Sequence, residues 1–371
     1  MTFAIALLAA GSVFFTAWHL LDVHGLKPEN RIDSGTLFDL VKLSFGVVAG
    51  AGALVALVVA YRRQRVDEDG ALREAMRLHT ERFTTAVSQL GDASAAVRLG
   101  GVHALTGLAD DAPTQALRQT CVDVLCAYLH LPHTPDPGTS SEHRDEHHRY
   151  LALRTVRHTI LRLIGDHYRR PADTYGSWQG SDLDLCGITL DGPMNFQEAD
   201  FSGGRVDFSN ATFSEGTVDF SNARFSGGTV DFSNASFSGA TVTLRRASFS
   251  GGLVHFLGAA FLGGSVHFDD AAFIDGAVFF SGAAFCGATV DFGDTAFLGG
   301  VVHFGSATFS GGTMDFSDAA FLGGTVDFSY ATFLGGTVDF ARAQGTAPRH
   351  LVPPVGTPLA PGLTLPASWL P

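Results

Sequence analysis

Cysteine is scarce in this sequence, and the motifs of the common enzyme classes are missing. The 371 residues include four cysteines, which are too scattered for a disulfide framework and form no CxxC metal pair. A reducing compartment therefore fits best. There is no P-loop, no G-x-S-x-G elbow and no pair of carboxylates in a predicted cleft. We therefore expect no catalytic residues, no cofactor and no bound metal.

Positive charge is scarce in the second half of the chain. Between Leu183 and Arg342 there are 17 acidic residues against five arginines, so this segment carries −12 of the formal net charge of −13. Affinity for nucleic-acid phosphates needs clustered Lys and Arg. Direct binding of nucleic acid is therefore not expected.

Two long runs near the N-terminus contain no charged residue. Thr2 to Leu21 and Leu43 to Tyr61 are each long enough to cross a bilayer as a helix. A cleaved signal peptide is the alternative for the first run, but it has no basic n-region and no convincing cleavage site. The second run is directly followed by three arginines, Arg62, Arg63 and Arg65. Because basic residues flank membrane spans on the cytoplasmic side, we expect the rest of the chain to lie in the cytoplasm. With two spans, the N-terminus would lie there too.

The second run contains Gly46 and Gly50 in a GxxxG pattern. Such small residues let helix backbones approach closely in a membrane. We expect packing against either the first span or a second copy of the chain, the latter giving a homodimer.

Residues 66–176 have a helical period. Val102, Leu105 and Leu108 fall three apart, and Cys121 and Leu125 continue the apolar pattern. Breaks at 91–92 and 110–113 predict three or four short antiparallel helices, followed by a loop and a helix over 150–168.

One motif in this region suggests zinc chemistry. His143, Glu146 and His147 fit H-x-x-E-H, in which two His on one helix face bind zinc and the Glu is a general base. The motif lies at the polar start of a helix after a loop, with no clear third ligand downstream. We interpret it as a solvated run of mixed charge.

Phenylalanine recurs with a strict period in the second half. After the opening residues Leu185, Leu190 and Phe196, the first series has a period of twelve: Phe201, Phe213, Phe225, Phe237, Phe249, Phe261, Phe273, Phe285, Phe297, Phe309, Phe321 and Phe333. The second series lies seven residues further on: Phe208, Phe220, Phe232, Leu244, Phe256, Phe268, Phe280, Phe292, Phe304, Phe316, Phe328 and Phe340. We call all these residues the ladder.

In both series a small or β-branched apolar residue stands two positions before the ladder residue, as in Val-Asp-Phe-Ser-Asn and Ala-Thr-Phe-Ser-Gly, with Thr295 and Met314 as exceptions. This resembles the pentapeptide-repeat family. The segments at 83–90, 98–105, 124–129 and 177–185 look like those of bacterial membrane-anchored members. The resemblance implies a right-handed, four-sided β-helix in which the ladder residue and its i−2 neighbour point inward.

Faces of five, seven, five and seven residues would make a 24-residue coil. Coils stack at about 4.8 Å, so twelve repeats predict about six coils and a rod of roughly 30 Å. Glycine pairs such as Gly203–Gly204, Gly227–Gly228 and Gly251–Gly252 would form bulges in the longer faces, because glycine adopts positive φ cheaply. A 12-residue coil is the alternative, but its interior is too small for two phenylalanines.

The two ends of the rod need protection because an end coil is an open sheet edge. We expect the helix over 150–168 to cap the first coil. The tail from Gln344 to Pro371 contains seven prolines and is predicted to be mostly free and disordered. It includes a weak PxxP match at 358–361.

The residue before each second-series ladder residue is expected to point outward. In a 24-residue coil these positions form two stripes, the first interrupted by Phe279 and the second by Thr243. Their acidic and His members are a candidate interaction surface. The first stripe has Asp207, Asp231, His255, His303 and Asp327, and the second has Asp219, His267, Asp291, Asp315 and Asp339. Carboxylates beside imidazoles could bind a metal or titrate near neutral pH. The simpler interpretation, that outward positions need only be polar, is favoured.

The sequence thus predicts a membrane-anchored α + β-solenoid protein. Residues 1–65 form a two-helix transmembrane anchor, 66–176 a cytoplasmic helical domain, 177–343 the β-helix and 344–371 the tail. A filled rod has no substrate cavity, so we expect a non-enzymatic scaffold that presents an acidic rod to a cytoplasmic protein partner from the bacterial cell membrane. The alternative is a DNA mimic that binds a DNA-binding protein such as a topoisomerase, as soluble members of the family do.

Overall fold

The computed structural model describes Gly11, Phe15, Thr16, His19 and residues 33–132 and 136–370. The chain divides into two compact units, Met1–Leu72 and Arg73–Pro371.

A single long helix, α2 (Ser34–Leu90), begins in the first unit. Its most apolar window has a mean hydropathy of 2.3, and among the described helices it is long and apolar enough to cross a membrane. The predicted second span, Leu43 to Tyr61, lies within it, and α2 runs unbroken past residue 65. The predicted first span, Thr2 to Leu21, lies outside the described residues except at the four isolated positions named above.

The helices of the second unit end where the sequence predicts breaks. α2 ends at Leu90 and α3 (Ala95–Asp110) at Asp110; α4 (Gln115–Leu129), the 3₁₀ turn η1 (Ser141–His143) and α5 (Arg144–Tyr168) follow. The side chain of Thr114 accepts the Leu117 N–H and caps α4. The apolar positions named from the sequence are buried in the core of these helices: Val102, Leu105, Leu108, Cys121 and Leu125. Val156 and Ile160 of α5 are buried with them.

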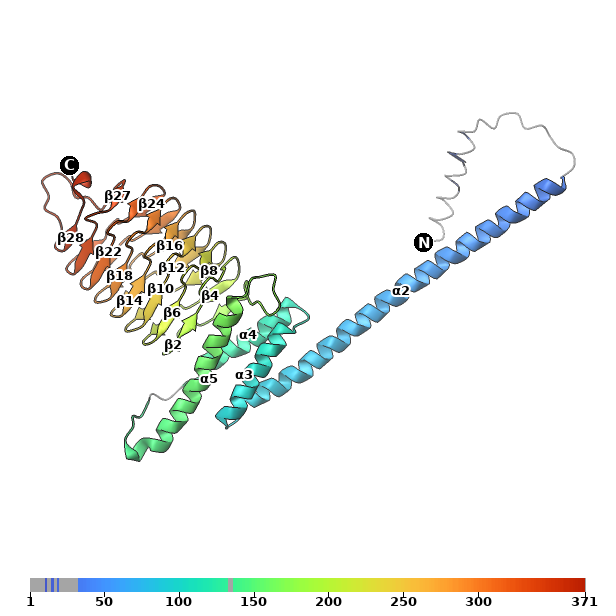
Figure 1. The fold of residues 1–371 in the computed structure, drawn as a ribbon, viewed down its shortest axis with the longest axis horizontal. Coiled ribbons are helices and arrows are strands. Elements are labelled where there is room, and N and C mark those ends of the chain that lie inside the picture. Colours follow the sequence, from blue (N-terminus) through green and yellow to red (C-terminus); the bar gives the residue numbers. More distant parts are fainter. Residues whose placement is uncertain (1–10, 12–14, 17–18, 20–32, 133–135, 371) are drawn as a thin grey trace. The chain divides into compact units, whose positions relative to one another are not determined.

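From Leu183 onward, the described chain coils into four parallel sheets, which we call faces A to D (Figure 1). Face A contains β1 (Leu183–Asp184), β4 (Arg205–Asp207), β8 (Thr229–Asp231), β12 (Leu253–His255), β16 (Ala277–Phe279), β20 (Val301–His303) and β24 (Thr325–Asp327). Face B contains β2 (Thr189–Leu190), β5 (Thr212–Phe213), β9 (Ser236–Phe237), β13 (Ala260–Phe261), β17 (Ala284–Phe285), β21 (Thr308–Phe309) and β25 (Thr332–Phe333).

Face C contains β3 (Met194–Asn195), β6 (Thr217–Asp219), β10 (Thr241–Thr243), β14 (Ser265–His267), β18 (Thr289–Asp291), β22 (Thr313–Asp315), β26 (Thr337–Asp339) and β28 (Leu363–Thr364). Face D contains β7 (Arg224–Phe225), β11 (Ser248–Phe249), β15 (Ala272–Phe273), β19 (Ala296–Phe297), β23 (Ala320–Phe321) and β27 (Gln344–Gly345).

The strand register confirms the 24-residue coil. Thr241 pairs with Ser265, and Phe249 with Phe273, each 24 positions on. The alternative 12-residue coil is therefore wrong. The expectation of about six coils was too low, because faces A, B and C contain seven, seven and eight strands. The opening turn at one end and the tail at the other add strands that the phenylalanine count did not include.

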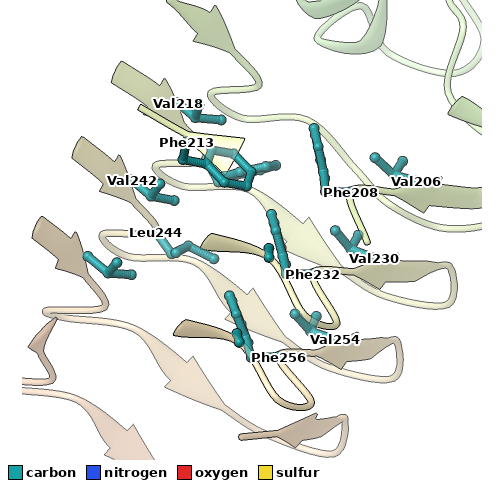
Figure 2. Close-up of a cluster of buried hydrophobic side chains, with 14 of the residues drawn as sticks. Val206, Phe208, Phe213, Val218, Val230, Phe232, Val242, Leu244, Val254 and Phe256 are labelled. Atoms are coloured by element: carbon teal, nitrogen blue, oxygen red, sulfur yellow. The ribbon is translucent and has the colours of Figure 1, made fainter. Parts of the chain in front are cut away.

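The ladder fills the interior of the coil. All of its members are buried except Phe333, which is half-buried near the last coil. Figure 2 shows Phe208, Phe232 and Phe256 stacked in one column, with ring centroids 5.1 and 4.8 Å apart in consecutive pairs. Each buried ring contributes on the order of 2 kcal/mol by area, and well-placed ring pairs add about 0.5–1.5 kcal/mol.

The turns use positive φ at a position that the sequence interpretation did not assign. Asn210 (φ 58°) and its equivalents two positions after the second-series ladder residues, as far as Tyr330, have positive φ, a conformation that Asn and Asp tolerate best after glycine. Gly204 has the expected positive φ of 71°. Gly228 does not, and is instead required by close packing, since a Cβ there would lie 2.9 Å from the Gly203 carbonyl oxygen.

The helix α5 caps the first coil, as predicted. The Tyr168 ring lies 5.7 and 5.4 Å from the rings of Phe196 and Phe201, and its hydroxyl donates to the Ser181 carbonyl at 2.7 Å. The backbone of Gly165 approaches the Asn195 carbonyl so closely that a Cβ would clash. Side-chain rings and a helix backbone thus cover the open end.

The prediction of a mostly free, disordered tail is wrong. β27 pairs with β23, and β28 pairs with β26, so the tail adds one strand before its first proline and one between Pro361 and Pro366. Leu351, Leu363, Leu365 and Trp369 are buried, the last in the 3₁₀ turn η2 (Ala367–Trp369). Proline cannot donate to a ladder, but the apolar residues between the prolines cover the last coil.

Candidate interaction surface

The outward stripes predicted from the sequence exist as columns of register partners. On face A, Asp207 pairs with Asp231, Asp231 with His255, and so on through Phe279, His303 and Asp327. On face C the column passes through Asp219, Thr243, His267, Asp291, Asp315 and Asp339. All ten predicted stripe residues therefore lie in two columns on two different faces.

The aspartates of these columns also have a structural role. In each, Oδ1 accepts the backbone N–H of the residue two positions later at 2.7–3.0 Å: Asp207 to Ser209, Asp219 to Ser221, Asp231 to Ser233, Asp291 to Gly293, Asp315 to Ser317, Asp327 to Ser329 and Asp339 to Ala341. This bond closes the turn that leads into the left-handed residue. One oxygen of each carboxylate is thereby committed to the turn.

Arginine neutralises part of the face A column. Arg205 donates to Asp207 Oδ2 at 2.8 Å and to Asp231 Oδ2 at 2.7 Å, so one guanidinium joins two coils. Burial by itself would raise the pKa of Asp207, but hydrogen bonds from Ser209 and Arg205 outweigh it and lower that pKa. The acidic surface is therefore weaker here than the residue count suggests.

The face A column becomes aromatic in its middle. The Phe279 ring lies 5.4 Å from the His255 ring and 5.7 Å from the His303 ring, stacked on the latter. Further along, His303 Nδ1 lies 3.6 Å from Asp327 Oδ2 and His350 Nδ1 lies 2.8 Å from Asp327 Oδ1. Burial acts to raise the pKa of Asp327, but the His350 and Ser329 hydrogen bonds lower it overall.

An apolar column on face D was missed by the sequence interpretation. The residue after each first-series ladder residue points outward, and on face D it is Ser226, then Ser250, then Ile274, Leu298 and Leu322. The three apolar members are 43%, 46% and 67% exposed. We call Ile274, Leu298 and Leu322 the face D column. The replacement of Ser by Leu or Ile at a fixed repeat position was a signal available in the sequence.

The H-x-x-E-H residues serve the loop before α5. His143 Nδ1 lies 2.9 Å from Ser140 Oγ, and His147 Nδ1 lies 2.6 Å from Asp136 Oδ1. The two His thus have separate polar partners. Within the described residues, the group placed to share a metal ion is His267, Asp269 and Asp291 on the rod, not the H-x-x-E-H residues.

Comparison with known proteins gives one family. A model described as pentapeptide repeats (nine copies) matches residues 185–229 and 298–344. No curated protein and no solved structure matches the chain.

Proposed function

Because this chain is a pentapeptide-repeat protein, we propose that its coil acts as a non-enzymatic scaffold that binds a protein partner through its outer faces. The filled interior supports this proposal, since stacked phenylalanines leave no room for a substrate inside the coil. Binding must then use the outside of the rod.

The observation that carries the proposal is the face D column. Three consecutive coils expose Ile or Leu at a position where two earlier coils have Ser. The fold does not require an apolar residue there, because Ser226 occupies the same position. Exposed apolar patches rimmed by polar residues are typical of protein–protein interfaces. The rod as a whole is acidic, with 17 acidic residues and five arginines between Leu183 and Arg342. A complementary partner would therefore present an apolar strip to the face D column and basic residues around that strip.

The experiment is proximity labelling in the native cell with wild type and two matched variants. The first carries Ile274→Ser, Leu298→Ser and Leu322→Ser, which restores the residue of the earlier coils. The second carries Leu262→Ser and Leu334→Ser, which removes exposed leucines from face B. We expect the first variant to lose a cytoplasmic neighbour that the wild type and the second variant label. An unchanged set of neighbours in the first variant would contradict the proposal.

The membrane anchor is part of the proposal. We infer that the part of α2 containing Leu43 to Tyr61 spans a bacterial cell membrane and that the Arg-rich segment after it keeps the rod in the cytoplasm. The mean hydropathy of 2.3 in this helix and its exposed apolar side chains support this. Extraction with alkaline carbonate tests it: the chain should stay with the membrane pellet, and release into the supernatant would contradict it.

The DNA-mimic alternative is less well supported. Duplex mimicry needs continuous negative charge, but the face A column contains His255, Phe279 and His303, and Arg205 pairs with its first two aspartates and offsets one of their two charges. A supercoiling assay with gyrase discriminates the two. Inhibition at micromolar protein would support the mimic, and no effect would leave the scaffold.

A further inference from the structure

On face C, the residue before the ladder residue is usually Asp and the residue after it is usually small, as in Val218-Asp219-Phe220-Ser221. Two neighbouring coils differ: residues 242–245 are Val-Thr-Leu-Arg, and residues 266–269 are Val-His-Phe-Asp. His267 therefore occupies the usual Asp position, and Asp269 the position of the small residue. His267 of β14 pairs with Asp291 of β18 on the next coil. This exchange brings one imidazole and two carboxylates together across neighbouring coils.

The three groups face one another at slightly more than hydrogen-bonding distance. His267 Nδ1 lies 3.7 Å from Asp269 Oδ1 and 3.7 Å from Asp291 Oδ2. All three ligand atoms lie within 4.8 Å of one another. Ligands at about 2.0–2.2 Å from a Zn²⁺ ion lie about 3–3.5 Å apart, so side-chain shifts of about 1 Å would bring all three onto one ion.

A buried oxygen with no partner points into this cluster. Asp269 is only 9% exposed, and its Oδ1 has no hydrogen-bond partner among the described residues. Its Oδ2 is occupied by Arg245 Nε at 2.6 Å. In Asp291 the oxygen that faces the cluster is Oδ2, because Oδ1 accepts the Gly293 N–H at 2.8 Å. Leaving a buried carboxylate oxygen unpaired is unfavourable, and a cation at this point would remove that penalty.

We propose that His267, Asp269 and Asp291 bind one divalent transition-metal ion such as Zn²⁺, with water completing its coordination. The imidazole nitrogen distinguishes this site from a Ca²⁺ or Mg²⁺ site, because those ions take oxygen ligands almost exclusively. The bound ion ties two neighbouring coils together in the middle of the rod. This revises our expectation from the sequence that the chain holds no metal, and it stands independently of the scaffold function.

The test counts Zn²⁺ ions bound per full-length chain in detergent micelles by equilibrium dialysis. The test variant is Asp291→Asn, which keeps the Oδ1 acceptor for the Gly293 N–H but replaces the ligating oxygen with an amide nitrogen. The matched control is Asp315→Asn, which makes the same change one coil further along the same column, where Oδ1 accepts the Ser317 N–H. Other His residues bind zinc equally in all three proteins, so the difference isolates this site.

We expect Asp291→Asn to bind one Zn²⁺ fewer than the wild type, and Asp315→Asn to bind the same number. As a second readout, Zn²⁺ should raise the unfolding temperature of the wild type and of Asp315→Asn more than that of Asp291→Asn. Equal zinc counts in all three proteins would overturn the proposal, leaving His267 as an inter-coil bridge between two carboxylates.

Discussion

The indole of Trp369 covers Phe340, the last ladder residue, with ring centroids 5.8 Å apart. The same indole lies 5.5 Å from Phe321 and donates its Nε1–H to the Gly345 carbonyl at 2.9 Å. One side chain near the C-terminus thus closes the apolar interior and fixes the β27 strand. The rod has a helical cap at one end and an aromatic cap at the other.

The aromatic cap predicts a local effect of Trp369→Ala. Truncation of a buried aromatic side chain costs about 3–5 kcal/mol, and here the loss should concentrate in the last coils. Hydrogen exchange should speed up in β26 and β28 and stay unchanged in β1 and β4. Ser368→Ala, an exposed neighbour, is the control. Equal protection of β26 in Trp369→Ala and in the wild type would show that the tail does not cap the rod.

The stacked interior predicts a large effect of a polar substitution in mid-rod. The Phe261 ring is fully buried between Phe237 and Phe285, at centroid distances of 4.8 and 4.6 Å. Phe261→Ser should lower the free energy of unfolding by about 3–5 kcal/mol, measured by urea denaturation. The outward Ser310→Ala should change it by less than about 0.5 kcal/mol. Similar losses in both variants would contradict the inward assignment of the ladder.

The junction of α5 with the first coil predicts an acid-sensitive contact. Asp191 accepts hydrogen bonds from His158 Nε2 at 3.1 Å and Arg154 Nε at 3.0 Å. Burial acts to raise the pKa of Asp191, but these hydrogen bonds outweigh it and hold the pKa well below the ordinary value of 3.8. A carboxylate with a lowered pKa stabilises the fold above its unfolded pKa, and this contribution is lost as pH falls through the folded value.

Asp191→Asn should therefore be less stable than the wild type near neutral pH, by about 1.5–3 kcal/mol for hydrogen bonds to a charged group. The difference should begin to shrink as pH falls toward the ordinary pKa of 3.8 and should go on shrinking down to the lowered pKa of the folded state, as followed by thermal unfolding at a series of pH values. Asp318→Asn removes an exposed pair with Arg342 and should have little effect. A constant difference across this pH range would refute the account of Asp191.

The glycines of α2 predict self-association in a membrane. A Cβ added at Gly46 or Gly50 meets no other atom of the described chain within 4 Å, so larger residues are tolerated by the helix itself. Replacing both with Ile should reduce dimer formation in lipid vesicles, measured by energy transfer between labelled chains, because close helix approach is blocked. Gly52→Ile is the control. A dimer fraction that stays the same after the double replacement would exclude packing through these glycines.

The 24-residue coil could be predicted because its inward positions are occupied by one residue type, Phe, at a fixed spacing. Phe208 and Phe232 reveal the 24-residue coil because both must be buried. The tail could not be predicted this way, because its prolines suggest a free segment while single apolar residues such as Leu363 and Trp369 make the contacts.

The surface was harder to predict than the interior. Asp207 closes a turn by accepting the Ser209 N–H. This role depends on the backbone geometry and cannot be read from the composition. Asp269 is one acidic residue among many in the sequence, and its role emerges only when Asp291, one coil away, is placed beside His267. The face D column could have been found by comparing residues at equal repeat positions.

Binding of a protein to face D can be measured by site-specific photo-crosslinking in the native cell. A photoreactive phenylalanine analogue replaces Leu298 in one chain and Ser310 in another; Ser310 is exposed on face B, which lies across the coil from face D. If the rod binds a protein through face D, position 298 should give a protein adduct that disappears when Ile274 and Leu322 are changed to Ser, and position 310 should give no adduct of that mass. Equal adducts from both positions, or none from position 298, would contradict it.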